Sequence, residues 1–261
     1  MPLMIIRLNC SFINFLKPYN LRLVKNTLNF VQPKPKNMKR QGIPFIKICC
    51  INNTDEAALA VKYGASALGL VGKMPSGPGV IEDSAINEIA RSVPPPVSTF
   101  LLTSETSAIE IVDHYQRTWT NSIQLVDRVD SKTYKVLREK LPWVKLVQVV
   151  HVIDDSSVKY ALEISSYADA LLLDSGNPKG KVKKLGGTGK THNWSISREI
   201  RLQSEVPVFL AGGLTSENVA EAIKTVNPYG IDVCSGVRTN GELDPNKLEK
   251  FMKQINIISN D

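Results

Sequence analysis

One polar segment of the sequence combines an acid with a cluster of glycines and a lysine. The apolar run 170–173 is short enough to be a buried strand, and Asp174 follows it directly. The sequence Gly-Gly-Thr-Gly-Lys then occupies residues 186–190. Three glycines in four residues allow several backbone N–H groups to point at one anion, and the lysine adds a positive charge. The pattern indicates an enzyme for a phosphorylated substrate. A surface loop is the alternative, because the spacing differs from that of a Walker A loop.

The length and the charge distribution limit the classes of protein that this sequence can encode. Its 261 residues suffice for one large domain, and barrels of eight strands and eight helices occupy about 250 residues. Of the 32 lysines and arginines, eight lie in the first 45 residues, which hold no acid. The rest of the chain has 24 basic and 25 acidic residues, so we expect no nucleic-acid partner. No apolar run approaches the roughly 20 residues of a membrane helix, so we expect no membrane partner.

The cysteines and histidines show no spacing that predicts a metal site or a disulfide framework. There is no CxxC pair and no pair of histidines at ligand spacing among Cys10, Cys49, Cys50, Cys234, His114, His151 and His192. A reducing compartment is the default for such a chain. We therefore expect neither a metal nor another cofactor.

Residues 1–44 are predicted to form a basic extension that precedes a single domain at 45–258. Basic, acid-poor starts are typical of transit peptides, although this one is poor in serine. The alternatives are a disordered tail, or a start codon placed too early, with Met38 as the true first residue. We expect a cytoplasmic protein, or a mitochondrial or plastid protein if residues 1–44 are a transit peptide.

From residue 45 onward, apolar runs alternate with amphipathic segments eight times. Strands are predicted at 46–50, 67–71, 97–102, 122–126, 144–150, 170–173, 206–210 and 231–234. Helices are predicted at 54–63, 82–91, 104–117, 131–141, 154–165, 194–203, 216–226 and 245–255, with Thr54 capping the first and Thr103 or Ser104 the third. Short connections between these units predict the α/β class and a (β/α)8 TIM barrel. An open doubly wound sheet is the runner-up, but it requires a glycine-rich turn after the first strand.

Five stretches between residues 45 and 255 resemble phosphoribosylanthranilate isomerase, a barrel enzyme of tryptophan biosynthesis. They are KIC at 47–49, LLLD at 171–174, GGTGKTHNW at 186–194, AGGLTSENVAEAI at 211–223 and PYGIDVCSGV at 228–237. The order and the spacing of these stretches are specific. The resemblance implies an isomerase that performs an Amadori rearrangement, turning N-(5-phosphoribosyl)anthranilate into the 1-amino-1-deoxyribulose 5-phosphate.

The resemblance also implies that Asp174 is the general acid and Cys49 the general base. The acid must protonate the ring oxygen as the ring opens, and the base must remove the proton from the neighbouring carbon. These roles require a raised pKa at Asp174 and a lowered pKa at Cys49. Cys50 replaces the glycine usual in the family, and strand alternation predicts that its side chain points away from the site. Cys234 is expected to be a packing residue.

The substrate phosphate is expected to meet the loops that follow the last three strands, because barrels commonly bind phosphate there. Glycines in these loops allow backbone N–H groups to approach the phosphate closely. The predicted phosphate-binding residues are Gly187, Thr188, Gly189, Gly212, Gly213, Ser235 and Gly236.

The sequence departs from the family where the anthranilate carboxylate is expected to bind. No arginine follows Ser76 in the Ser-x-Arg pattern, and Gln-Leu-Val-Asp at 124–127 replaces Gln-Leu-His-Gly. Lys73 and Arg128 are the candidates for compensating cations. Two other functions therefore stay open: an isomerase of another aminated sugar phosphate, and a non-catalytic paralogue that binds a phosphorylated ligand. A monomer and a homodimer are both compatible with the sequence.

Overall fold

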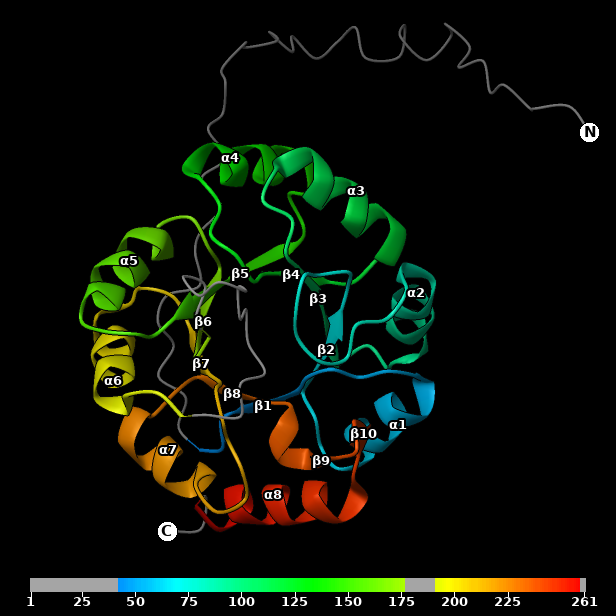
Figure 1. Ribbon diagram of the computed structural model, residues 1–261, viewed down its shortest axis with the longest axis vertical. Coiled ribbons are helices and arrows are strands. Elements are labelled where there is room, and N and C mark those ends of the chain that lie inside the picture. Colours follow the sequence, from blue (N-terminus) through cyan, green and yellow to red (C-terminus); the bar gives the residue numbers. More distant parts are fainter. Residues whose placement is uncertain (1–41, 177–190, 259–261) are drawn as a thin grey trace, which may run out of the picture. The chain divides into compact units, whose positions relative to one another are not determined.

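The computed structural model describes residues 42–176 and 191–258, which form a closed barrel of eight parallel strands with helices around it (Figure 1). The strands are β1 (Phe45–Ile48), β2 (Ala67–Val71), β3 (Ser98–Thr103), β4 (Ser122–Leu125), β5 (Lys145–His151), β6 (Ala170–Asp174), β7 (Val208–Leu210) and β8 (Gly230–Val233). They pair in chain order, and β1 closes the barrel on β8 from Phe45↔Gly230 to Ile48↔Val233. The predicted TIM barrel is therefore confirmed.

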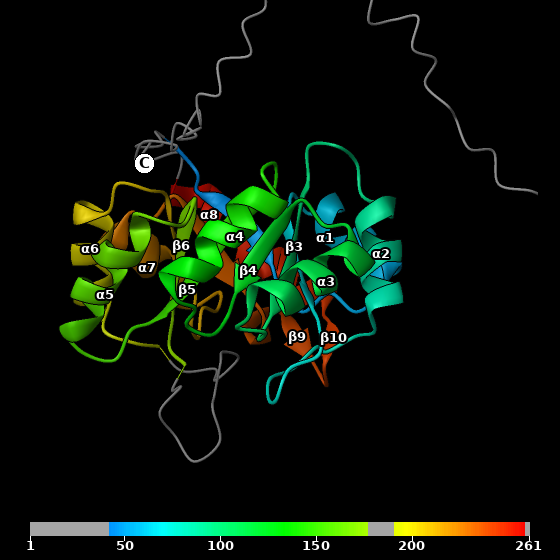
Figure 2. The ribbon, with the colours of Figure 1, turned by 90° about the horizontal axis from the view of Figure 1, so that it is seen from above.

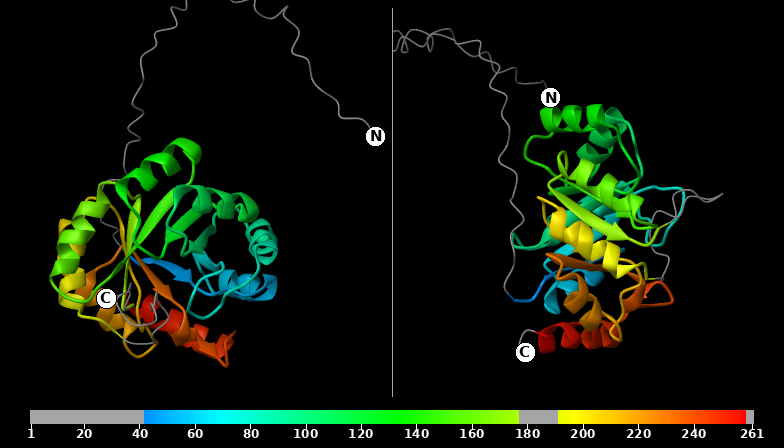
Figure 3. Two further views of the ribbon diagram at one scale, coloured as in Figure 1. Left: turned by 45° about the horizontal axis from the view of Figure 1, so that its top comes forward. Right: turned by 90° about the vertical axis from the view of Figure 1, so that its left-hand side faces the viewer.

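In the described residues, seven α-helices lead from one barrel strand to the next and an eighth follows β8, and they cover the outside of the barrel (Figure 3). They are α1 (Thr54–Lys62), α2 (Asp83–Ser92), α3 (Ala108–Thr118), α4 (Ser131–Lys140), α5 (Ser156–Ser165), α6 (Trp194–Gln203), α7 (Val219–Val226) and α8 (Pro245–Ile258). Among the described residues, none of these helices has the length and the apolar character needed to cross a membrane.

Two predicted helix caps, those of α1 and α3, are wrong. The cap of α1 is Asn53 rather than Thr54, because the Asn53 side chain accepts the Glu56 N–H at 2.9 Å. Helix α3 begins after Ser107, whose hydroxyl accepts the Glu110 N–H, whereas Thr103 still belongs to β3. A side-chain acceptor for a free N–H near the helix start decides both boundaries.

Alternation along the strands separates two cores. In β5, Leu146 and Val150 belong to the large core between the sheet and the helices, whereas Val147 and Val149 belong to a smaller core. The smaller core fills the interior of the barrel, as the period of two in a strand requires. Side chains at the carboxyl ends of the strands on this inner face are thereby positioned at the mouth.

The segment after β8 contains structure that the sequence reading did not predict. A 3-10 turn, η2 (Ser235–Val237), leads into a two-stranded antiparallel ribbon of β9 (Arg238–Thr239) and β10 (Glu242–Leu243). This ribbon and the loop after β2 extend on the same side of the barrel (Figure 2). Both segments therefore shape the face at which the strands end.

Candidate active site

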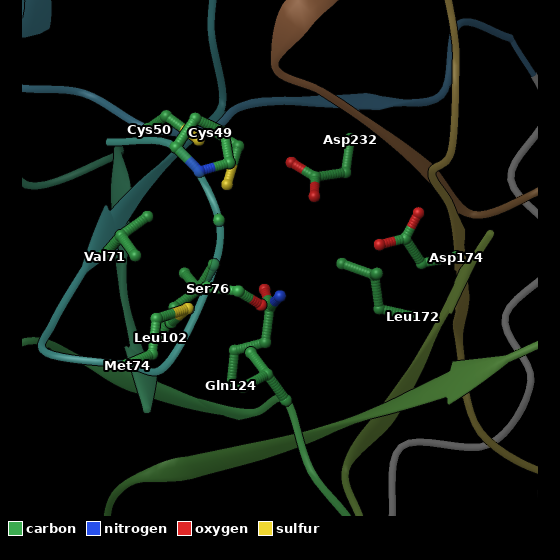
Figure 4. Close-up of a pocket in the computed structure, with 13 residues that line it drawn as sticks. Cys49, Cys50, Val71, Met74, Ser76, Leu102, Gln124, Leu172, Asp174 and Asp232 are labelled. Carbon is green, nitrogen blue, oxygen red and sulfur yellow. The ribbon is translucent and has the colours of Figure 1, made fainter. Parts of the chain in front are cut away.

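The predicted acid and the predicted base line one pocket at the carboxyl ends of the strands. Asp174 ends β6, and Cys49 directly follows β1. Both side chains are buried, and both border the pocket together with Asp232 of β8 (Figure 4). Residues more than 120 positions apart are thus brought to one cavity, because parallel strands of a barrel end at one face.

The surroundings of Asp174 favour its protonated form. Burial raises the pKa of Asp174 to about 6, and the nearby Asp232 acts in the same direction. The Ser175 N–H, 2.7 Å from Asp174 Oδ1, partly opposes this shift. Gly212 lies against this corner with a φ of +82°, and a Cβ there would come within 3.1 Å of the Asp174 carboxyl. The carboxyl group can therefore hold a proton near neutral pH, as a general acid must.

The surroundings of Cys49 favour its thiolate. A hydrogen bond from the Cys50 thiol is the largest influence that lowers the pKa of Cys49, and the Lys47 ammonium adds to it. Burial and the negative charge of Asp232 oppose this shift without reversing it. Gly69 of β2 leaves the space for these groups, since a Cβ there would lie 2.7 Å from the Cys49 sulfur and 2.9 Å from Lys47 Nζ.

A buried ion pair between Lys47 and Asp232 was not singled out from the sequence. Lys47 Nζ lies 2.8 Å from Asp232 Oδ1, on neighbouring strands in register. Burial disfavours the charge on Lys47, but the Asp232 carboxylate outweighs it and raises the pKa of Lys47. The sequence did contain a signal for this pair. One lysine and one aspartate lie at inward-facing positions of two short apolar strands, where a charged side chain needs a partner.

Cys50 does not point away from the site as predicted. Its side chain is buried and lines the pocket, and its sulfur lies 2.7 Å from the sulfur of Cys234. The reason is that β1 ends at Ile48 and Cys50 has a φ of +64°, so strand alternation no longer applies. The structure describes Cys49, Cys50 and Cys234 as free thiols.

The predicted phosphate-binding residues fall into two groups. Gly187, Thr188 and Gly189 lie outside the described residues. Gly212 and Gly213 both have positive φ, in the loop after β7. The segment after β8 is in direct contact with this loop, since a Cβ on Gly236 would lie 2.0 Å from the Leu214 carbonyl oxygen. The structure therefore brings the loops of Gly212, Gly213, Ser235 and Gly236 together, and their contact with phosphate stays a prediction.

The two predicted carboxylate-binding cations do not line the described pocket. Lys73 is exposed, and the exposed Arg128 stacks on the Tyr160 ring with its guanidinium carbon 3.9 Å from the ring centre. The loop after β2 instead contributes Met74, Ser76, Gly77 and Pro78 to the pocket. Their role in binding a carboxylate stays a prediction.

Gln124 of β4 is a further pocket residue to which the sequence reading gave no role. It is 3% exposed, it lines the pocket, and its Oε1 has no hydrogen-bond partner within the described residues. His151, which ends β5, donates from Nε2 to the Val126 carbonyl at 3.2 Å and does not line the pocket. A buried amide oxygen without a partner is costly, so Gln124 offers an acceptor to a ligand. The described residues contain no group of three or more metal-binding side chains.

The fold and the site together define a (β/α)8-barrel enzyme whose acid and thiol share one pocket at the barrel mouth. A family model described as N-(5'phosphoribosyl)anthranilate (PRA) isomerase matches residues 46–254. The chain is 37% identical over 214 residues to N-(5'-phosphoribosyl)anthranilate isomerase 2 of Methanosarcina mazei. This match covers 82% of this chain and 92% of that protein. The chain belongs to the phosphoribosylanthranilate isomerase family.

Solved structures of this family share the fold. The enzyme from Thermotoga maritima superposes with a TM-score of 0.69 at 28% identity, covering 82% of this chain and 98% of that one. Another phosphoribosylanthranilate isomerase structure holds reduced 1-(o-carboxyphenylamino)-1-deoxyribulose 5-phosphate. It superposes with a TM-score of 0.65 at 25% identity, and the match covers 82% of this chain and 98% of that one.

Proposed function

We propose that this chain is a phosphoribosylanthranilate isomerase, in which Asp174 and Cys49 carry the proton transfers. The observation that carries the assignment of roles is the shared pocket of a carboxyl with a raised pKa and a thiol with a lowered pKa. Family membership supports the reaction, an aldose–ketose rearrangement in tryptophan biosynthesis. The reduced product analogue in a related structure supports the same phosphorylated substrate.

The chemistry follows from the protonation states of the two groups. Protonated Asp174 gives its proton to the ring oxygen of the ribose, and the C1–O bond breaks as the aniline nitrogen forms a C=N double bond. The Cys49 thiolate then removes the proton from C2, and the electrons of that C–H bond pass into the C=N system. The resulting enol takes up a proton at C1 and loses the proton of its C2 hydroxyl, which gives the ketone of the product, so that only protons and bonding electrons are rearranged.

The buried ion pair of Lys47 and Asp232, of which only Asp232 lines the pocket, affects the pKa of both groups. Asp232 raises the pKa of both Asp174 and Cys49, whereas the Lys47 ammonium lowers both. Because Lys47 neutralises Asp232 at 2.8 Å, Cys49 is partly shielded from that negative charge. We infer that burial holds the acid protonated, while the pair limits the effect of the Asp232 charge on Cys49 and so allows the thiol to ionise.

The phosphate is assigned to the loops after β6, β7 and β8, and the carboxylate to the mouth near the loop after β2. The contact between the loops of Gly212 and Gly236 supports the first assignment. Lys73 and Arg128 are exposed cations outside the pocket lining, and either could take the carboxylate role only if its side chain reached the mouth. An isomerase of another aminated sugar phosphate and a silent paralogue are the remaining alternatives, because the pocket lining described here includes no arginine or lysine side chain.

Assembly and location are proposed at a coarser level. A dimeric relative from Thermotoga maritima supports a homodimer, and a monomer is the alternative. We propose a cytoplasmic enzyme, with mitochondrion or plastid as the alternative if residues 1–44 are a transit peptide.

The test is turnover of freshly prepared phosphoribosylanthranilate by the full chain. We expect the substrate fluorescence to fall in an assay coupled to the next pathway enzyme. Cys49→Ala and Asp174→Asn should each reduce kcat by about 10²–10⁴-fold, the range of general acid–base catalysis. The control is Glu205→Gln, an exposed position outside the pocket, which should retain full turnover. Absence of turnover in a folded chain that still binds the reduced product analogue would instead favour the silent paralogue.

A further inference from the structure

The barrel mouth holds a second pair of thiols beside the base. Cys50 follows β1, Cys234 follows β8, and their sulfur atoms lie 2.7 Å apart. A disulfide bond is about 2.05 Å long, so the sulfurs need to approach by only about 0.7 Å. The two strands are already hydrogen-bonded at this level, from the Cys49 N–H to the Val233 carbonyl at 2.8 Å.

The backbone at Cys50 directs its side chain toward Cys234. Cys50 has a φ of +64°, a conformation that costs a residue with a Cβ about 1–2 kcal/mol. Arg238 holds this turn, because its guanidinium donates to the carbonyls of both Cys49 and Cys50. Gly79 packs on the other side, where a Cβ would lie 2.5 Å from the Cys50 Cβ. The turn is therefore fixed with its thiol facing the neighbouring strand end.

The three thiols form a chain that ends at the base. Cys234 donates to the sulfur of Cys50, and the Cys50 thiol donates to Cys49. Of the three, Cys234 is the least buried, so it is the thiol that a reagent from solution meets first. Any reaction that removes the hydrogen from Cys50 also removes a donor from Cys49.

We propose that Cys50 and Cys234 are a redox-active dithiol, which a small disulfide such as oxidised glutathione converts into an internal disulfide that lowers the activity of the base Cys49. The inference rests on the proposed function only for its activity measurement.

The oxidation proceeds by two thiol–disulfide exchanges. The Cys234 thiolate attacks one sulfur of the small disulfide, and the first small thiolate leaves. The Cys50 thiol, whose pKa is raised by its hydrogen bonds with Cys234 and Cys49 and by burial, must then lose its proton. Its sulfur attacks the Cys234 sulfur of this mixed disulfide, and the second small thiolate leaves and takes up a proton. The protein loses two protons and two electrons, the small disulfide gains them as two thiols, and Cys49 is not consumed.

Closure of this disulfide has two consequences at the site. Cys50 no longer donates to Cys49, and this hydrogen bond is the largest influence that lowers the pKa of Cys49. The new bond also joins the base segment to the segment of Ser235, which starts the turn η2 assigned to phosphate. We therefore expect oxidation to move the rise of kcat/KM to higher pH, and to lower kcat/KM at neutral pH by about tenfold per unit of that shift.

The experiment treats the full chain with oxidised glutathione, with and without later reduction by dithiothreitol. Free thiols are alkylated, the chain is digested with trypsin after denaturation, and the peptides are identified by mass. We expect peptide 48–62 to be linked to peptide 225–238, with one alkylated cysteine left in the first peptide. Fragmentation should place the alkyl group on Cys49.

Two variants are used, so that the proposal can still be tested if one of them folds poorly. Cys234→Ser and Cys50→Ser each remove one partner, so each should lose the linkage and the response to oxidised glutathione, measured relative to its own reduced form. The wild-type chain should regain its activity with dithiothreitol.

The proposal is overturned if the two peptides stay unlinked, if the linkage forms without loss of activity, or if Cys49 itself carries glutathione. A reduced chain without isomerase activity would refute the proposed function. The peptide linkage would still test the dithiol in that case.

Discussion

Asp174 occupies a position where the requirement of its proposed catalytic role conflicts with stability. Burial raises its pKa from 3.8 to about 6, because the ionised form loses its hydration. The folded state therefore binds the proton more tightly than the unfolded state does. This contribution to stability is fully present below pH 3.8, and it is lost as the pH rises through about 6.

Replacement of Asp174 by asparagine should remove the proposed general acid and stabilise the fold. At pH 7.5 the wild type has to ionise a buried carboxyl, a cost of about 3 kcal/mol for a shift of this size. We expect Asp174→Asn to raise the free energy of unfolding at pH 7.5 by about 1–3 kcal/mol, and this gain should shrink between pH 6 and 4. Urea unfolding at several pH values measures it, with Glu205→Gln as the exposed control. An equal effect at every pH would contradict the raised pKa.

At the scale of the elements, the loops after β7 and β8 act as one unit. Gly236 has no Cβ to hold the loops apart, and a Cβ there would lie 2.0 Å from the Leu214 carbonyl oxygen. No flexible side chain can move aside at this contact, because the atom belongs to the backbone. Any side chain at this position must therefore separate the two loops.

The variant Gly236→Ala tests whether these loops hold the phosphate together. We expect KM for the substrate to rise about tenfold, which corresponds to the loss of one good hydrogen bond to a charged group. The comparison is Gly241→Ala in the same segment, where a Cβ meets nothing within 4 Å but φ is +87°. That change should lower stability by about 1 kcal/mol and leave KM near the wild-type value. Equal KM values for both variants would contradict the proposal that these two loops share the phosphate site.

The sequence predicted the elements better than it predicted their ends. Alternating apolar runs located all eight strands, and the position of Asp174 at the end of β6 followed from its run. The orientation of Cys50 did not follow, because a positive φ directly after a strand breaks the period of two. The pairing of Lys47 with Asp232 depends on which strands close the barrel, and this information lies outside any local pattern.

At the scale of the whole molecule, closure of the barrel depends on contacts between the first and the last strands. Besides the β1–β8 ladder, a buried ion pair joins helix α1 to the segment after β8, with Arg238 Nη2 lying 2.8 Å from Glu56 Oε2. The same Glu56 carboxylate accepts the N–H of Leu243 at 2.8 Å and that of Asn52 at 3.0 Å. Although burial opposes ionisation, these donors lower the pKa of Glu56.

Removal of one partner of this pair should therefore destabilise the entire barrel. Arg238→Met leaves the Glu56 carboxylate buried with only backbone donors, and we expect the free energy of unfolding to fall by about 3–5 kcal/mol. The control Lys253→Met breaks the exposed pair with Glu249 on α8, and it should cost less than about 1 kcal/mol. Adding Glu56→Gln to Arg238→Met should restore part of the loss, because the uncompensated charge is removed. If Arg238→Met unfolds at the same urea concentration as Lys253→Met, the closure of this barrel rests on the β1–β8 ladder and its core rather than on the ion pair.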